Sequence, residues 1–225
     1  MAELLLSANE ARVIAALVEK SITTPQYYPM SVNAIMLAAN QKSSRNPVMN
    51  LSEGDTAAAL NRLEEQKLAS RDEHSGRVVK WRHRFNHQML LQSQPMAVLV
   101  ALMLRGPQTV AELRANAANL AGPPDAESMQ KAIEDLSDRA QPLLMLLPRA
   151  PGQKEARYAH TLCGTPATPE PSHVEDVATA PRQPKADTTW LEQRVAALEE
   201  RVAELERRSV TGGSIAKTDV DAPGA

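Results

Sequence analysis

Apolar residues recur at helical spacing through the first 65 residues of the chain. Ser7 to Glu10 form a capping box ahead of an apolar stripe, which predicts that a first helix begins there. A second helix is predicted from its cap at Ser31 to about Ala39. A third is predicted to begin at Ser52 to Asp55. It follows a polar loop, which begins at Asn40 and in which Pro47 disfavours helix.

The pattern then changes to alternation. A strand is predicted over residues 77–85, with Val79, Trp81, His83 and Phe85 on one face and Lys80, Arg82 and Arg84 on the other. It is expected to pair with a strand over 68–71, across a turn at 72–76. Three helices followed by a hairpin is the order of a winged helix.

The same order returns in the second half of the chain. An apolar helix is predicted first, then a helix with a capping box, then a helix capped by Asp125, and finally a hairpin with a turn at Pro151 and Gly152. The corresponding segments are Met96 to Leu104, Thr109 to Glu112, Asp125 to about Asp138, Leu143 to Leu147, and Arg157 to Leu162.

Two matching segments indicate that one unit has been duplicated. PMSVNAI at 29–35 and PQTVAEL at 107–113 align with proline, hydroxyl, valine and aliphatic residues in step. The predicted fold class is therefore mainly α with small β-hairpins (α+β), built as tandem winged-helix domains at 1–87 and 93–163.

The remaining residues change character. Five prolines and no aromatic residue predict a disordered linker over 164–189. A coiled-coil helix is expected at 190–208 and a disordered tail at 209–225.

The coiled-coil prediction rests on a heptad pattern with valine at a and leucine at d, which favours a parallel two-stranded coil. Glutamate at e and arginine at g would pair across a parallel homodimer, whereas a single helix folded back on the body is the alternative. The dimerisation residues are Leu191, Val195, Leu198, Val202 and Leu205.

Composition changes this picture little. A chain of 225 residues with 43% hydrophobic and 23% charged residues is ordinary for a soluble protein without membrane spans. The N-terminus lacks the features of a secretory signal. Because Cys163 is the only cysteine, no intrachain disulfide is possible and a cytoplasmic location is expected. The net charge is −2, with a mildly basic body and an acidic tail.

Two basic clusters are candidate contacts for the phosphate backbone of double-stranded DNA. On the predicted strand, Lys80, Arg82 and Arg84 share one face, although a solvated face neutralised by nearby acids is the alternative. In the polar loop, Lys42, Ser43, Ser44 and Arg45 precede a helix start that could hold an anion. The alternative is that Lys42 and Arg45 pair with Glu53 and Asp55.

The predicted third helices are acidic. Base edges are read mostly by Arg, Lys, Asn and Gln, and these helices offer only Asn61, Arg62, Gln130 and Lys131. We therefore expect little sequence-specific readout.

The segments ITTPQYYPMSVNAIMLAANQKSSRNPVMNLSEG, GRVVKWRHRF, LRGPQTVAELR and RYAHTLCG resemble the YceH-like family of uncharacterised bacterial proteins. The resemblance spans about residues 7 to 164. It implies tandem winged helices and no reaction.

Signals for an enzyme, metal or cofactor are weak. His83 and His87 lie on a predicted strand and loop, where they need not converge on a metal. His160 and Cys163 resemble a base and nucleophile by composition only. We expect no enzyme, no catalytic residue, no metal and no cofactor. The leading function is a DNA-binding regulator or architectural protein, and the alternative is a protein-interaction scaffold without DNA binding.

Overall fold

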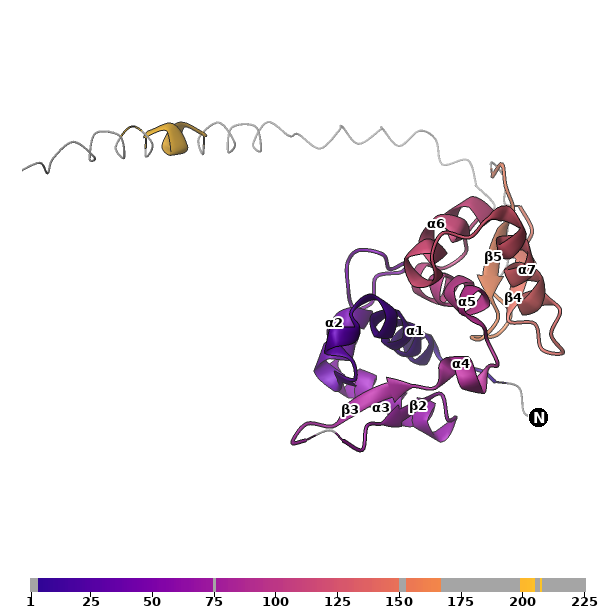
Figure 1. The fold of residues 1–225 in the computed structure, drawn as a ribbon, viewed down its shortest axis with the longest axis horizontal. Coiled ribbons are helices and arrows are strands. Elements are labelled where there is room, and N and C mark those ends of the chain that lie inside the picture. The colour runs from indigo at the N-terminus through magenta and orange to yellow at the C-terminus, as the bar shows by residue number, and fades with distance from the viewer. Residues whose placement is uncertain (1–3, 75, 150–152, 167–198, 205–206, 208–225) are drawn as a thin grey trace, which may run out of the picture. The chain divides into compact units, whose positions relative to one another are not determined.

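The computed structural model describes residues 4–74, 76–149, 153–166, 199–204 and 207, and it divides into the units Met1–Ser172 and His173–Ala225 (Figure 1). In the second unit, residues 199–204 are helical and Val202 is 53% exposed. The predicted tail, the linker beyond residue 166 and four of the five predicted dimerisation residues lie outside the described residues.

The first half of the body contains a three-stranded antiparallel sheet of order β1-β3-β2, packed with helices. This agrees with the α+β class predicted from the sequence. The elements are α1 Ala8–Thr23, η1 Pro25–Tyr27, β1 Met30–Ser31, α2 Val32–Ala39, α3 Glu53–Glu65, β2 Ala69–Arg71, β3 Lys80–His83 and α4 Phe85–Gln88.

The second half repeats this order with a two-stranded sheet. Its strand β5 pairs with β4 on one side and, through Tyr158, with Gln108 on the other. In the first half β3 pairs in the same way with β2 and with Met30, which precedes Gln108 by 78 residues. The elements are α5 Ser93–Arg105, α6 Val110–Ala121, α7 Ala126–Ser137, β4 Leu144–Leu147 and β5 Arg157–His160.

The predicted helix starts are confirmed by side-chain hydrogen bonds. Reciprocal capping boxes begin α1, α3 and α6, where a serine or threonine hydroxyl accepts a backbone N–H and an acidic side chain accepts the amide of the cap. Ser31 caps α2 and Asp125 caps α7, each with a side-chain oxygen that accepts one backbone N–H of the first turn. Local sequence alone is sufficient to place these five starts.

The strand predicted over residues 77–85 is shorter in the structure, and this part of the prediction is wrong. β3 ends at His83, and Phe85 begins α4. The amide of Arg84 still donates to the carbonyl of Leu68 at 2.7 Å, but the chain then turns so that Phe85 is fully buried. Val79, predicted to share a strand face with Trp81 and Phe85, is 50% exposed and precedes the strand.

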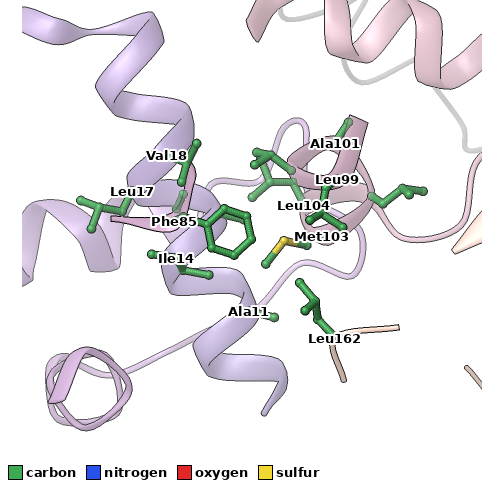
Figure 2. Packing of buried hydrophobic residues seen from close by; sticks show 14 of the residues in the cluster. Ala11, Ile14, Leu17, Val18, Phe85, Leu99, Ala101, Met103, Leu104 and Leu162 are labelled. Carbon is green, nitrogen blue, oxygen red and sulfur yellow. The ribbon is translucent and has the colours of Figure 1, made fainter. Parts of the chain in front are cut away.

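The two halves of the body share one hydrophobic core. Ile14 and Leu17 of α1 lie with Phe85 on one side, and Leu99 and Leu104 of α5 lie on the other (Figure 2). Helices α1 and α5 are in contact, and all five side chains are at most 3% exposed. Since burying one such side chain contributes about 1.5–3 kcal/mol, this shared core stabilises both halves together.

A buried arginine also joins the halves. Arg12 of α1 is 2% exposed and donates to the carbonyls of Ala39, Pro47 and Leu104, which close α2, the polar loop and α5. Burial and the nearby charge of Arg45 lower the pKa of Arg12. Because its partners are backbone carbonyls, the guanidinium fixes the path of the loop against the second half.

None of the helices in the described part of the chain combines the length and the apolar character needed to cross a membrane.

Candidate nucleic-acid interface

The first wing, defined as residues 67–84, consists of β2, β3 and their connection. In the register of the sheet, Arg71 lies opposite Trp81 and Ser70 lies opposite Arg82. Trp81 is 3% exposed, whereas Lys80 and Arg82 are exposed on the other face. The alternation predicted from the sequence therefore holds within β3, and the two cations lie on the outer face of the sheet.

Arg84 follows the strand but remains part of this surface. Its backbone lies outside β3, yet its Nε donates to the hydroxyl of Ser70 at 3.1 Å. Ser70 lies opposite Arg82, so the Arg84 side chain contacts the outer face of the wing. The three predicted cations of the wing are all exposed.

Arg82 is held by two neighbours. Its Nε lies 2.7 Å from Oδ1 of Asp72, and its guanidinium carbon lies 5.7 Å from the centroid of the Tyr28 ring. The hydrogen bond to Asp72 raises the pKa of Arg82. Asp72 neutralises part of this face, as the alternative interpretation of the sequence required, but Arg82 keeps 48% of its side chain exposed.

The first wing carries more positive charge than sequence reasoning assigned to it. It holds six lysines and arginines against Asp72 and Glu73, although the whole chain has a net charge of −2. The density of bases between residues 67 and 84 is the sequence signal that could have identified the additional three. The six exposed cations are Lys67, Arg71, Arg77, Lys80, Arg82 and Arg84.

The polar loop divides into an exposed part and a buried part. Lys42, Ser43 and Ser44 are exposed, and Ser44 has a positive φ of 60°. The side chain of Arg45 is 0% exposed and forms an ion pair with Glu19 at 2.5 Å. A phosphate cannot reach the guanidinium in this position, so the structure removes Arg45 from the predicted contacts.

The alternative interpretation, in which Arg45 pairs with Glu53 or Asp55, is wrong as well, because its acidic partner is Glu19. The Arg45 guanidinium also donates to the carbonyls of Ala38 and Ser44 and to the side chain of Gln41. Asp55 instead accepts the amide and hydroxyl of Ser52, which lowers its pKa. The start of α3 is thus closed by its own capping box.

Where α3 meets β2, polar side chains form a second surface. Arg71 donates from Nη2 to Oδ1 of Asn61 at 3.1 Å, and its Nε lies 3.3 Å from a carboxylate oxygen of Glu64. Its guanidinium carbon lies 5.2 Å from the centroid of the Trp81 ring. We name Asn61, Glu64, Arg71 and Trp81 the α3–wing corner. Sequence reasoning identified Asn61 but missed Arg71.

The corresponding helix of the second half is acidic on its exposed side. On α7, Gln130 donates to Glu134 at 2.8 Å, and Asp135 pairs with Arg139 at 3.1 Å. Lys131 is exposed between them. Two of the polar candidates predicted from the sequence are therefore surrounded by carboxylates.

Two histidines, His83 and His160, are half-buried and have lowered pKa values. The Ser21 hydroxyl donates to the carbonyl of Val18 at 2.7 Å, so Nε2 of His83 must carry the hydrogen that joins it to Ser21 Oγ at 3.0 Å. Burial, reinforced by the charge of His87, lowers the pKa of His83 to about 4. Burial lowers the pKa of His160 to about 4 as well.

Cys163 lacks the environment of a reactive thiolate. Although Cys163 is exposed, local desolvation and the charge of Glu10 raise its pKa, whereas nucleophilic cysteines have a lowered one. Among the described residues, no group of three or more His, Cys, Asp or Glu side chains is placed to hold a metal ion.

Comparison with known proteins identifies the family. The sequence profile described as "Protein of unknown function, DUF480" matches residues 6–153, which is more than half of the chain. The chain belongs to the DUF480 family. The match covers α1 through β4, so it includes the first wing and the α3–wing corner.

Relatives of this DUF480 protein are UPF0502 proteins of bacteria. It is 45% identical to one from Geotalea daltonii over 163 residues, 72% of this chain and 75% of the relative. It is 38% identical to one from Geobacter sulfurreducens over 197 residues, 88% of each chain, and 43% identical to one from Koribacter versatilis over 169 residues, 75% of this chain and 79% of the relative. The resemblance to a family of uncharacterised bacterial proteins is confirmed.

Proposed function

We propose that this protein binds double-stranded DNA as a regulator or architectural protein, and that the first wing contacts the phosphate backbone. The observation that carries the proposal is the concentration of six exposed lysines and arginines in residues 67–84, against two acidic residues. Phosphate contacts by Lys and Arg dominate the affinity of proteins for DNA.

The arrangement around the first wing supports this assignment. Three helices precede the hairpin, and the sheet order is β1-β3-β2, as expected of a winged helix. Ser31 and Ser70 lie opposite Lys80 and Arg82 in the sheet, so hydroxyl groups accompany the cations on one face. Serine hydroxyls and backbone amides are common partners of phosphate.

Lys42, Ser43 and Ser44 are proposed as a smaller contact of the same kind. The buried side chain of Arg45 anchors the loop to Glu19 and to the carbonyl of Ala38, which holds these three exposed residues in place. The coiled coil at 190–208 is proposed to join two copies in parallel, which would present two wings to one duplex.

The salt dependence of binding tests the proposal. Three phosphate contacts from Lys80, Arg82 and Arg84 would give a slope of about −2.7 in log affinity against log salt for one wing, and about −5 for two. Replacing all three with alanine should flatten the slope by about 0.9 per lost contact, equally for unrelated duplexes. Fluorescence anisotropy with a labelled duplex, from low to physiological salt, measures both.

A matched control makes the same charge change elsewhere. Lys131, Arg149 and Lys154 are exposed cations of the second half, and replacing all three with alanine should leave the slope unchanged. Unfolding curves of both triple variants show whether loss of the ion pair between Arg82 and Asp72 has weakened the fold. Full retention of the slope in the wing variant, with wild-type binding intact, would remove the wing from the interface.

The acidic exposed side of α7 favours a second candidate function. Glu127, Glu134 and Asp135 are exposed on this helix, and they suit a basic protein partner better than DNA. In that case the protein is an interaction scaffold, and no saturable duplex binding occurs even at low salt.

A further inference from the structure

The α3–wing corner joins the third helix to the wing by the side chain of Arg71. That side chain is 55% exposed, yet three groups restrain it: Asn61 Oδ1 at 3.1 Å, Glu64 Oε2 at 3.3 Å, and the Trp81 ring. Trp81 is itself 3% exposed and fixed in the core. An exposed arginine normally samples many rotamers. Arg71 differs because these three groups hold its side chain in one position at the surface.

Arg71 also determines the orientation of Asn61. Arginine has only donors, so the amide oxygen of Asn61 must face Arg71 and the NH2 group must point away from it. Asn61 is exposed, and no partner of its Nδ2 is found among the described residues. The corner therefore presents the donors of Asn61 beside those of Arg71.

We propose that the α3–wing corner is a base-contacting site for an acceptor-rich edge, that of guanine, when DNA is bound as proposed above. Guanine presents two acceptors, N7 and O6, in the major groove, whereas adenine presents one acceptor and one donor. Because Arg71 occupies the amide oxygen of Asn61, Asn61 offers only the two N–H donors of its Nδ2, and these suit the two acceptors of guanine. This inference rests on the proposed function, and Arg71 has the role of a positioning residue for Asn61.

Charge along α3 favours this end of the helix. Glu53 and Asp55 lie at its first turn, where carboxylates would repel phosphates. Near the other end, Arg62 and Lys67 offset Glu64 and Glu65, and Arg62 pairs with Glu65 at 3.6 Å. The last turns therefore carry no net charge, whereas the first turn carries two acids. A duplex held by the first wing is thus expected to meet the last turns of α3.

The described residues of the second half of the body form no equivalent corner. Counted from the helix caps Ser52 and Asp125, Asn61 corresponds to Glu134 and Arg62 to Asp135. Strand β4 has the sequence LMLL and supplies no arginine. Base contact is therefore assigned to the first half alone.

Selection from a randomised duplex pool, followed by anisotropy on the selected duplexes, tests the inference. The wild type should prefer guanine at one defined position by about 10-fold over adenine. Asn61→Ala and Arg71→Lys should each reduce this preference severalfold. Arg71→Lys keeps the charge and should keep the salt slope, which separates positioning from phosphate attraction.

Three outcomes decide the matter. Loss of the preference in Asn61→Ala with an unchanged salt slope supports the corner. Saturable binding without base preference, or with a preference that Asn61→Ala retains, overturns the corner and leaves the proposed wing contact standing. Absence of saturable binding at low salt overturns the proposed function together with the corner. The exposed Gln130→Ala serves as the control in the second half.

Discussion

Replacing Arg45 with methionine should destabilise the protein by about 3 kcal/mol. The side chain is fully buried and donates to both carboxylate oxygens of Glu19 and to the carbonyl of Ala38. Breaking a buried ion pair by removing one partner typically costs about 3–5 kcal/mol, because the other charge is left without compensation. Glu19 retains 15% exposure, so water reaches it and the lower end of the range applies.

Urea unfolding followed by circular dichroism measures this loss as a shift of the midpoint at constant slope. Lys42→Met is the matched control, since Lys42 lies three residues away in the same loop and is exposed. The double variant Arg45→Met with Glu19→Met should lose less than the sum of the two single variants. A loss below about 1 kcal/mol in Arg45→Met, the value of a surface ion pair, would mean that the Arg45–Glu19 pair contributes no more than an exposed one.

Backbone strain, acid stability and assembly can each be tested by a separate change. Gly106→Ala should cost more than the control Gly122→Ala in the same unfolding assay. Both glycines have positive φ, but only at Gly106 would an added Cβ lie 3.4 Å from a loop carbonyl. The pKa values of His83 and His160 are lowered to about 4, so the unfolded chain binds protons before the folded one as pH falls. Between pH 6.5 and 4, each histidine should therefore lower the free energy of unfolding by about 3 kcal/mol. His83→Gln should reduce that loss. Deleting residues 190–208 should lower the mass found by sedimentation equilibrium, and an unchanged mass at every concentration would exclude the coil as the dimer contact.

Local sequence was sufficient where one or two turns of chain decide the structure. The capping boxes of α1, α3 and α6 placed three helix starts, because the cap and its partner are three residues apart. The alternation around Trp81 correctly separated its core face from the face of Lys80 and Arg82. The same alternation continued into Phe85 and could not show that the chain turns into a helix there.

Contacts between distant residues could not be predicted in this way. Arg45 lies 26 residues from Glu19, and the partners considered from the sequence were the nearer acids Glu53 and Asp55. The α3–wing corner brings Asn61 and Arg71 together only because a turn follows α3 and folds β2 back beside it. Candidate residues could be identified by type, but their availability depends on tertiary structure.

The first and last segments of the body meet. The amide of Leu6 donates to the carbonyl of Leu162 at 2.7 Å, and a Cβ added to Gly164 would lie 3.6 Å from the side chain of Leu5. Together with the contact of α1 with α5, this makes the order of the two halves along the chain immaterial to which faces pack. A circular permutant of residues 4–166 in which the second half comes first is therefore expected to keep the same core, so that neither half has to come first in the chain.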